Sequence, residues 1–240
     1  MTLRGLVSAV QFLTRLPTPQ VAGLEPAELS RSAVWFPLVG LLIGLVVAFA
    51  VWLGSASGPW IGGLAGLIAW VWITGALHLD GLGDVADALG AAHRNPGRFH
   101  EVLRDPHIGS FGVIAIALQL LAKLSLLADV AAGPKIWAVA LVPAWARLGT
   151  LVWSCAVPPF RQGLGERFSW AIDRRAIAAH GVALVAASAW LSPALLGALA
   201  ILPGIALYWR KRHGGITGDC LGASVEVTET LLLLLLTLRW

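Results

Sequence analysis

The segment HLDGLGDVADALGA places three carboxylates within eight residues, at Asp80, Asp84 and Asp87. With about 100° of rotation per helical residue, the three side chains fall within a stripe roughly 60° wide. Carboxylates this close repel one another unless a cation lies between them, and Mg²⁺ typically binds one or two carboxylates together with substrate phosphate. The pattern favours a Mg²⁺ site at these aspartates, with a solvated helix end as the alternative.

A second polar cluster, RDPHIGSFG, begins with Arg104 and Asp105 and precedes a long apolar run. Pro106 lacks a backbone N–H and favours a turn before that run. An arginine in such a turn could bind phosphate through two parallel hydrogen bonds. Taken alone, ordinary loop charges are the simpler interpretation of this pair.

The third cluster, GDCLGASVEVTE, places Asp219 and Glu226 seven residues apart and therefore on one face of a helix. A carboxylate inside a membrane segment is costly and indicates a functional residue by default. Lys123 and Arg147 are the cations that lie in apolar runs and could pair with it. For Arg147 we favour a functional role, whereas snorkelling towards the membrane surface explains Lys123 equally well. We expect Asp219 and Glu226 to share a site with the aspartate stripe.

These clusters lie in a chain of 240 residues, of which 58% are apolar and only 12% are charged. A typical soluble protein has roughly 25% charged residues, so this chain cannot form a soluble exterior. Two cysteines are too few for a disulfide-rich secreted protein. The long, continuous apolar runs favour helices over a barrel. We therefore predict an all-α, polytopic membrane protein with one domain, residues 1–240.

Seven segments are apolar enough to cross a membrane, which takes about 20 residues. They comprise residues 33–53, 59–79, 110–128, 136–157, 176–191, 193–209 and 220–238. The seventh is the least certain because it contains Glu226 and Glu229.

The basic residues predict the orientation of these spans. With a cytoplasmic N-terminus, 13 of the 17 Lys and Arg residues fall on the cytoplasmic side, in agreement with the positive-inside rule. They are Arg4, Arg15, Arg31, Arg94, Arg98, Arg104, Arg161, Arg167, Arg174, Arg175, Arg210, Lys211 and Arg212, whereas only Lys135 and Arg239 fall outside. All three polar clusters then reach the cytoplasmic face. Because membrane topology explains the net charge of +4, we predict no nucleic-acid partner.

The motifs resemble those of the cobalamin synthase family, the adenosylcobinamide-GDP ribazoletransferases. The matching pieces are FLTRLPTP at residues 12–19, GALHLDGLGDVADALG at 75–90, RDPHIGSFGV at 104–113 and GDCLGASVE at 218–226. They occur in the family's order over nearly the whole chain. One departure is Ala88, where the family usually has Gly, and it affects helix flexibility more than metal ligation.

The resemblance implies an enzyme of the cytoplasmic (inner) membrane of a prokaryote that requires Mg²⁺. It would join α-ribazole or its 5′-phosphate to adenosylcobinamide-GDP, release GMP and produce adenosylcobalamin or its 5′-phosphate. Its partners would be these small molecules and membrane lipid, and homo-oligomerisation remains open. The implied catalytic residues are Asp80, Asp84, Asp87, Asp219 and Arg104, and the implied substrate-binding residues are Arg15, His78, Arg104, Asp105, Arg147 and Glu226.

Three other functions fit parts of the pattern. An ion-coupled transporter would use intramembrane carboxylates, but those are expected near the membrane midplane, whereas the aspartate stripe lies at the edge. A structural membrane subunit would not need three clusters on one side. An enzyme acting on lipid diphosphates would use the same Mg²⁺ chemistry, although the matched motifs argue against it.

Overall fold

The computed structural model describes residues 2–19, 30–93, 96–160 and 172–238. Arg94, Arg161, Arg167 and Arg239, which contributed to the topology prediction, lie outside these ranges. The described residues form α-helices, short 3₁₀-helices and one isolated bridge. The α-helices are α1 (Leu3–Leu13), α3 (Phe36–Ser55), α4 (Pro59–Thr74), α5 (Leu77–Ala92), α6 (Phe99–Val102), α7 (Ser110–Ala131), α8 (Leu141–Ala156), α10 (Arg174–Leu191), α11 (Ala198–Arg212) and α12 (Gly218–Thr237). The 3₁₀-helices are η1 (Ala33–Trp35), η2 (Pro96–Arg98), η3 (Ile136–Ala140) and η4 (Pro193–Gly197). The predicted all-α class is confirmed.

Five of the seven predicted spans are confirmed as helices long and apolar enough to cross a membrane. They are Ser30–Ser55, Ser110–Ala131, Ile136–Ala156, Pro193–Arg212 and Gly218–Thr237. The fifth predicted span forms α10, whose first turn holds Arg174 and Arg175 and lowers its mean hydropathy. The second predicted span is broken, and α4 and α5 together would give a sixth crossing. The described residues therefore contain five or six such spans rather than seven.

The break between α4 and α5 is a bend of 88°. Gly75 ends α4 with φ 61° and ψ 24°, and Ala76 follows with φ 61° and ψ 14°. Both residues are left-handed, a conformation that costs a non-glycine residue roughly 1 kcal/mol. The side chain of Arg15 packs over Gly75, where a Cβ would collide with it. Helix α5, which carries Asp80, Asp84 and Asp87, is less apolar than α4, so the bend separates the apolar helix from the polar one.

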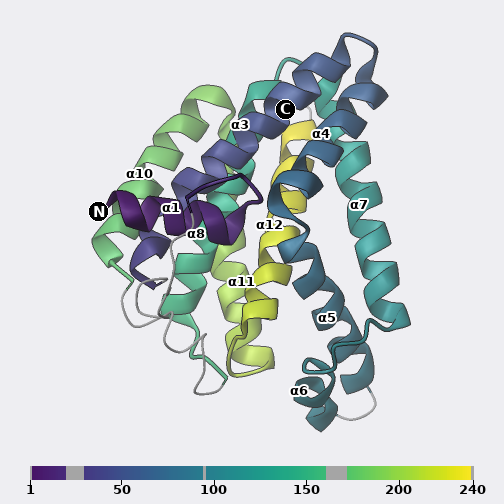
Figure 1. Cartoon of the computed structure of the whole chain (residues 1–240), viewed down its shortest axis with the longest axis vertical. Coiled ribbons are helices and arrows are strands. Elements are labelled where there is room, and N and C mark those ends of the chain that lie inside the picture. Colours follow the sequence, from purple (N-terminus) through teal and green to yellow (C-terminus); the bar gives the residue numbers. More distant parts are fainter. Residues whose placement is uncertain (1, 20–29, 94–95, 161–171, 239–240) are drawn as a thin grey trace.

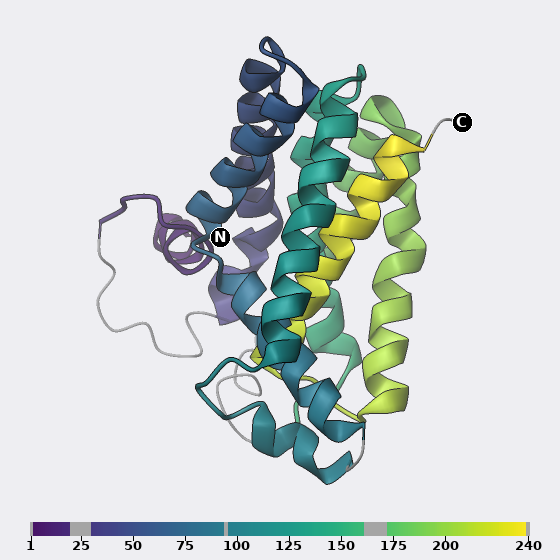
Figure 2. The same ribbon diagram turned by 90° about the vertical axis from the view of Figure 1, so that its right-hand side faces the viewer.

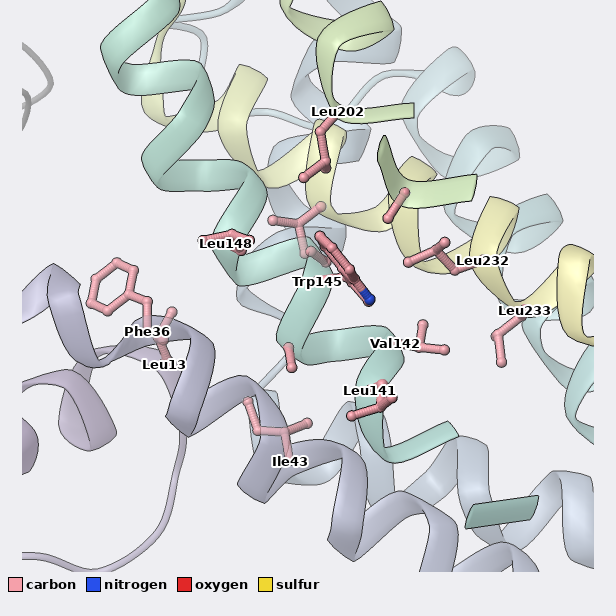
Figure 3. Close-up of a cluster of buried hydrophobic side chains, with 14 of the residues drawn as sticks. Leu13, Phe36, Ile43, Leu141, Val142, Trp145, Leu148, Leu202, Leu232 and Leu233 are labelled. Atoms are coloured by element: carbon pink, nitrogen blue, oxygen red, sulfur yellow. The ribbon is translucent and has the colours of Figure 1, made fainter. Parts of the chain in front are cut away.

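Helix α8 lies at the centre of the bundle and is almost entirely buried. Figure 3 shows Leu141, Val142, Trp145 and Leu148 of this helix among apolar side chains from neighbouring helices. Helix α3 approaches it closely because Gly40 and Gly44 face the backbone of η3 and α8, where any Cβ would collide. Small residues spaced in this way bring membrane helices into close backbone contact.

One end of the bundle collects the elements that carry the polar clusters. Helix α6, the first turns of α7 and α12 and the last turn of α11 lie together at the lower end of Figure 1, and Figure 2 agrees. The short helix α1 lies across the bundle near the α4–α5 bend. The backbone N–H of Arg15, just after α1, donates to the Ile73 carbonyl at 2.8 Å and fixes this placement.

Candidate active site

The aspartate stripe on α5 lies against the start of α12. Gly81 packs on the backbone of Asp219, so that a Cβ at Gly81 would lie 2.9 Å from the Asp219 carbonyl oxygen. Asp80 is exposed, and Asp84 and Asp219 are half-buried. The glycine between the aspartates therefore brings carboxylates of two distant segments beside one another.

These carboxylates act on each other electrostatically. Partial burial and the negative charges of Asp80, Asp219 and Asp87 raise the pKa of Asp84 to about 6. Among the ion pairs formed by the described residues, none includes Asp80, Asp84 or Asp219. The cluster consequently favours a proton or a cation as a counter-charge.

Asp87 has a different environment at the end of the stripe. Its carboxylate accepts hydrogen bonds from the backbone N–H of Gly109 at 2.7 Å and of Gly112 at 3.0 Å. These amides belong to the N-terminus of α7, which has no side-chain cap at its own N-cap residue Gly109. A Cβ at either glycine would collide with the Asp87 carboxylate. Asp87 therefore joins α5 to α7, a role that its position in the stripe did not predict.

Arg104 and Asp105 lie in the exposed loop before α7. Asp105 Oδ1 accepts from the His107 backbone N–H at 3.0 Å and lies 2.7 Å from His107 Nδ1. These hydrogen bonds hold the pKa of Asp105 below its usual value. Asp105 thus stabilises its own turn, whereas Arg104 lines a cavity of about 190 Å³ together with Asp219.

Arg15 and Asp80 lie on a second and larger cavity of about 620 Å³. It runs between the end of α1, the α4–α5 bend and α7, and its walls include Phe12 and Ile116. The structure therefore gives the carboxylate cluster an arginine-containing cavity on each of two flanks.

Glu226 lies apart from these cavities in a buried ion network. Lys123 Nζ on α7 donates to Glu226 Oε2 at 2.7 Å and to Glu229 Oε2 at 2.5 Å. Gln119 Nε2 donates to Glu226 Oε2 at 2.8 Å. Lys123 is only 2% exposed, so it forms an ion pair instead of snorkelling. Glu229 and Gln119 were not among the predicted site residues, although Glu229 follows Glu226 by one helical turn.

The same network reaches α8 and α5. The Arg147 guanidinium donates from Nη1 to Glu229 Oε1, and its Nη2 lies 3.4 Å from His78 Nδ1. Arg147 and Glu229 are fully buried, and His78 is 7% exposed. Arg147 and His78, which the resemblance assigned to substrate binding, therefore meet inside the protein at the first turn of α5.

The carboxylates at the α5–α12 contact match the ligand chemistry of Mg²⁺. Within the described ranges, no three Asp, Glu, His or Cys side chains are arranged as a ready-made metal site. Mg²⁺ nevertheless binds commonly through one or two carboxylates, with water and substrate phosphate completing its shell. Asp80 and Asp84 fit that requirement because no cation among the described residues pairs with them.

Comparison with known proteins gives one consistent result. A family model described as cobalamin-5-phosphate synthase matches residues 5–237. A relative from Thiobacillus denitrificans, named adenosylcobinamide-GDP ribazoletransferase, is 52% identical over 97% of this chain and 94% of its own length. Relatives with the same name from Laribacter hongkongensis and Novosphingobium aromaticivorans are 53% and 49% identical, over 97% of this chain and 96% and 95% of theirs. No solved structure matches significantly.

Proposed function

The chain belongs to the cobalamin-5-phosphate synthase family, and from this membership we propose that it is an adenosylcobinamide-GDP ribazoletransferase. The full-length identity of about half to relatives of that name carries the proposal. The enzyme joins α-ribazole or its 5′-phosphate to adenosylcobinamide-GDP and releases GMP. Because the relatives are named as transferases, the ion-coupled transporter is set aside.

The site residues fit a displacement at a diphosphate. Arg15 and Arg104 supply positive charge on the two flanks of the carboxylate cluster. Asp219 shares a cavity with Arg104 and would accept the proton from the attacking hydroxyl. Asp80 and Asp84 would hold Mg²⁺, which neutralises phosphate oxygens when bound. Asp87 and Asp105 contribute by fixing the N-terminus of α7 and the turn before it.

The distribution of basic residues supports a proposal for the location. We propose that the site faces the cytoplasm from the inner membrane and that the N-terminus is cytoplasmic. Arg98, Arg104 and Arg210–Arg212 belong to the same end of the described bundle as Asp219, and basic loops favour the cytoplasmic side.

A direct assay tests this function. Purified protein in detergent receives adenosylcobinamide-GDP, α-ribazole and Mg²⁺, and GMP and the corrinoid product are measured by chromatography and mass spectrometry. We expect GMP release that depends on the acceptor and on Mg²⁺, and loss of turnover in Asp84→Asn. GMP release at the same rate without acceptor, or no corrinoid product, would contradict the assignment.

A further inference from the structure

Two cavities meet the carboxylate cluster from different flanks. The α12 cavity, about 190 Å³, is lined by Arg104, Asp219, His100 and Phe160. The α1 groove, about 620 Å³, is lined by Arg15, Asp80, Phe12 and Ile116. Each cavity thus contains one arginine and one carboxylate of the cluster, and Asp80 and Asp219 approach each other where Gly81 packs on α12.

This arrangement suits a reaction between two large substrates. In phosphoryl transfer, the attacking and leaving oxygens lie roughly in line on opposite sides of phosphorus. Two substrates therefore approach the reacting centre from different directions. A cluster with one cavity on each flank satisfies this condition, whereas a single cavity would force both substrates through the same opening.

The walls of the α12 cavity suit a nucleoside. The rings of His100 and Phe160 lie 4.4 Å apart with an edge-to-face geometry. Aromatic side chains of this kind stack readily on a heterocyclic base. Arg104 is exposed at the same cavity, and a guanidinium binds phosphate oxygens in pairs. The cavity therefore has partners for both the base and a 5′-phosphate.

The α1 groove suits a larger, amphiphilic ligand. Its volume is about three times that of the α12 cavity, and its walls include exposed apolar side chains such as Phe12 and Leu77. Arg15 is exposed at the groove and packs over the α4–α5 bend, so its position is fixed close to the α5 helix that carries Asp80. An anionic diphosphate attached to a bulky group matches this combination of charge and apolar surface.

We propose that the two substrates bind in separate cavities. The ribazole acceptor binds in the α12 cavity with its 5′-phosphate on Arg104, and the adenosylcobinamide-GDP donor binds in the α1 groove with its diphosphate near Arg15. This inference rests on the proposed function and assigns a subsite to each substrate. It makes Arg104 the residue that distinguishes α-ribazole 5′-phosphate from α-ribazole.

Steady-state kinetics with the full-length enzyme test the assignment. Arg104→Gln should raise the KM for α-ribazole 5′-phosphate at least about tenfold, the value of one charge-assisted hydrogen-bond pair. It should raise the KM for α-ribazole and for the donor far less than the KM for the phosphorylated acceptor. Arg15→Gln should raise only the donor KM. Arg98→Gln is the matched control, because Arg98 is also exposed and pairs with Glu101 rather than lining either cavity.

Equilibrium binding keeps the test independent of turnover. Each substrate is titrated separately against wild type and variants by tryptophan fluorescence, and Phe12→Ala provides a second groove variant if Arg15→Gln is unstable. The proposal is supported if the groove variants lose affinity only for the donor and Arg104→Gln loses affinity only for the phosphorylated acceptor. Weakening of the same substrate by Arg15 and Arg104 variants overturns it. Absence of acceptor-dependent GMP release by wild type instead refutes the proposed function.

Discussion

Asp84 and Asp87 are separated by one helical turn on α5, yet their surroundings give them different tasks. The pKa of Asp84 is raised to about 6 by burial and by its carboxylate neighbours. Asp87 instead satisfies two backbone amides at the start of α7. Substitution of Asp84 should therefore lower mainly turnover, whereas substitution of Asp87 should lower mainly stability.

Asp84→Asn should lower Mg²⁺-dependent turnover at least about a hundredfold, which corresponds to roughly 2.7 kcal/mol of barrier. Without Mg²⁺ the same substitution should stabilise the fold, because it removes a charge that its neighbours repel. After allowance for solvent screening, we expect about 1 kcal/mol, or a Tm higher by about 2–4 °C. Thermal unfolding in detergent with EDTA measures the effect.

The pH dependence gives a check on the same residue. Since folding raises the pKa of Asp84 from 3.8 to about 6, the folded state binds the proton more tightly. Without Mg²⁺, the free energy of unfolding should fall as pH rises from about 4 to 6. This slope should be smaller in Asp84→Asn. Equal slopes in wild type and Asp84→Asn would contradict the predicted repulsion.

Asp87→Ala should destabilise the protein by about 0.5–2 kcal/mol, the usual cost of losing a helix cap. Asp87→Asn should cost less, because its amide oxygen can still accept one of the two N–H groups. Urea or thermal unfolding in detergent measures both. Gly112→Ala should be similarly harmful, since its Cβ would meet the Asp87 carboxylate. If Asp87→Ala unfolds like wild type and changes only the Mg²⁺ requirement, Asp87 is a metal ligand rather than a cap.

At the scale of helices, the buried ion network fixes how α5, α7, α8 and α12 meet. Glu229 on α12 is the shared acceptor, since it binds Lys123 of α7 and Arg147 of α8. Arg147 also reaches His78 at the start of α5. A buried charge that loses its partner is strongly destabilising. Loss of Glu229 should therefore lower the free energy of unfolding more than loss of any other member of the network.

Glu229→Gln should lower the free energy of unfolding by about 3–5 kcal/mol, because Arg147 then loses its carboxylate partner. Glu226→Gln should cost less, since Lys123 retains Glu229. Unfolding in mixed detergent micelles measures both values, and Glu101→Gln, at an exposed pair, is the control with little change. Equal stability of Glu229→Gln and wild type would show that the network contributes nothing to helix packing.

Some of the helices and side-chain contacts could be predicted from sequence and others could not. The periodicity of Asp80, Asp84 and Asp87 predicts their shared face. Apolar length predicts seven spans, of which five are confirmed. The bend at Gly75 and Ala76 could not be predicted, because a left-handed alanine has no local signal and the packing of Arg15 over Gly75 is a tertiary contact. Likewise, the partners of Lys123 depend on which helices become neighbours. Gly109 and Gly112 offered a signal for the Asp87 contact, but only the packed helices show which side chain requires them.

For the whole molecule, the orientation in the membrane is the main prediction. In a Cys155→Ser background, which removes the exposed native thiol, Arg98→Cys should resist an impermeant reagent added to intact cells. Gly133→Cys, after α7 at the other end, should be labelled. Lysed cells provide the control in which both thiols react. Labelling of Arg98→Cys but not of Gly133→Cys in intact cells would show the opposite orientation, with the active site on the outer face.

The buried network also has a consequence for the energetics of the surrounding membrane. Lys123 and Arg147 contribute two positive charges, and Glu226 and Glu229 contribute two negative ones, so the ionised cluster has no net charge. An electric field across a bilayer does work only on charge that moves along it. While the helices that hold it stay in place, such a cluster moves no charge along the field. We therefore expect this cluster to add no dependence of turnover on membrane potential. Turnover measured in proteoliposomes with and without an imposed potential would check this.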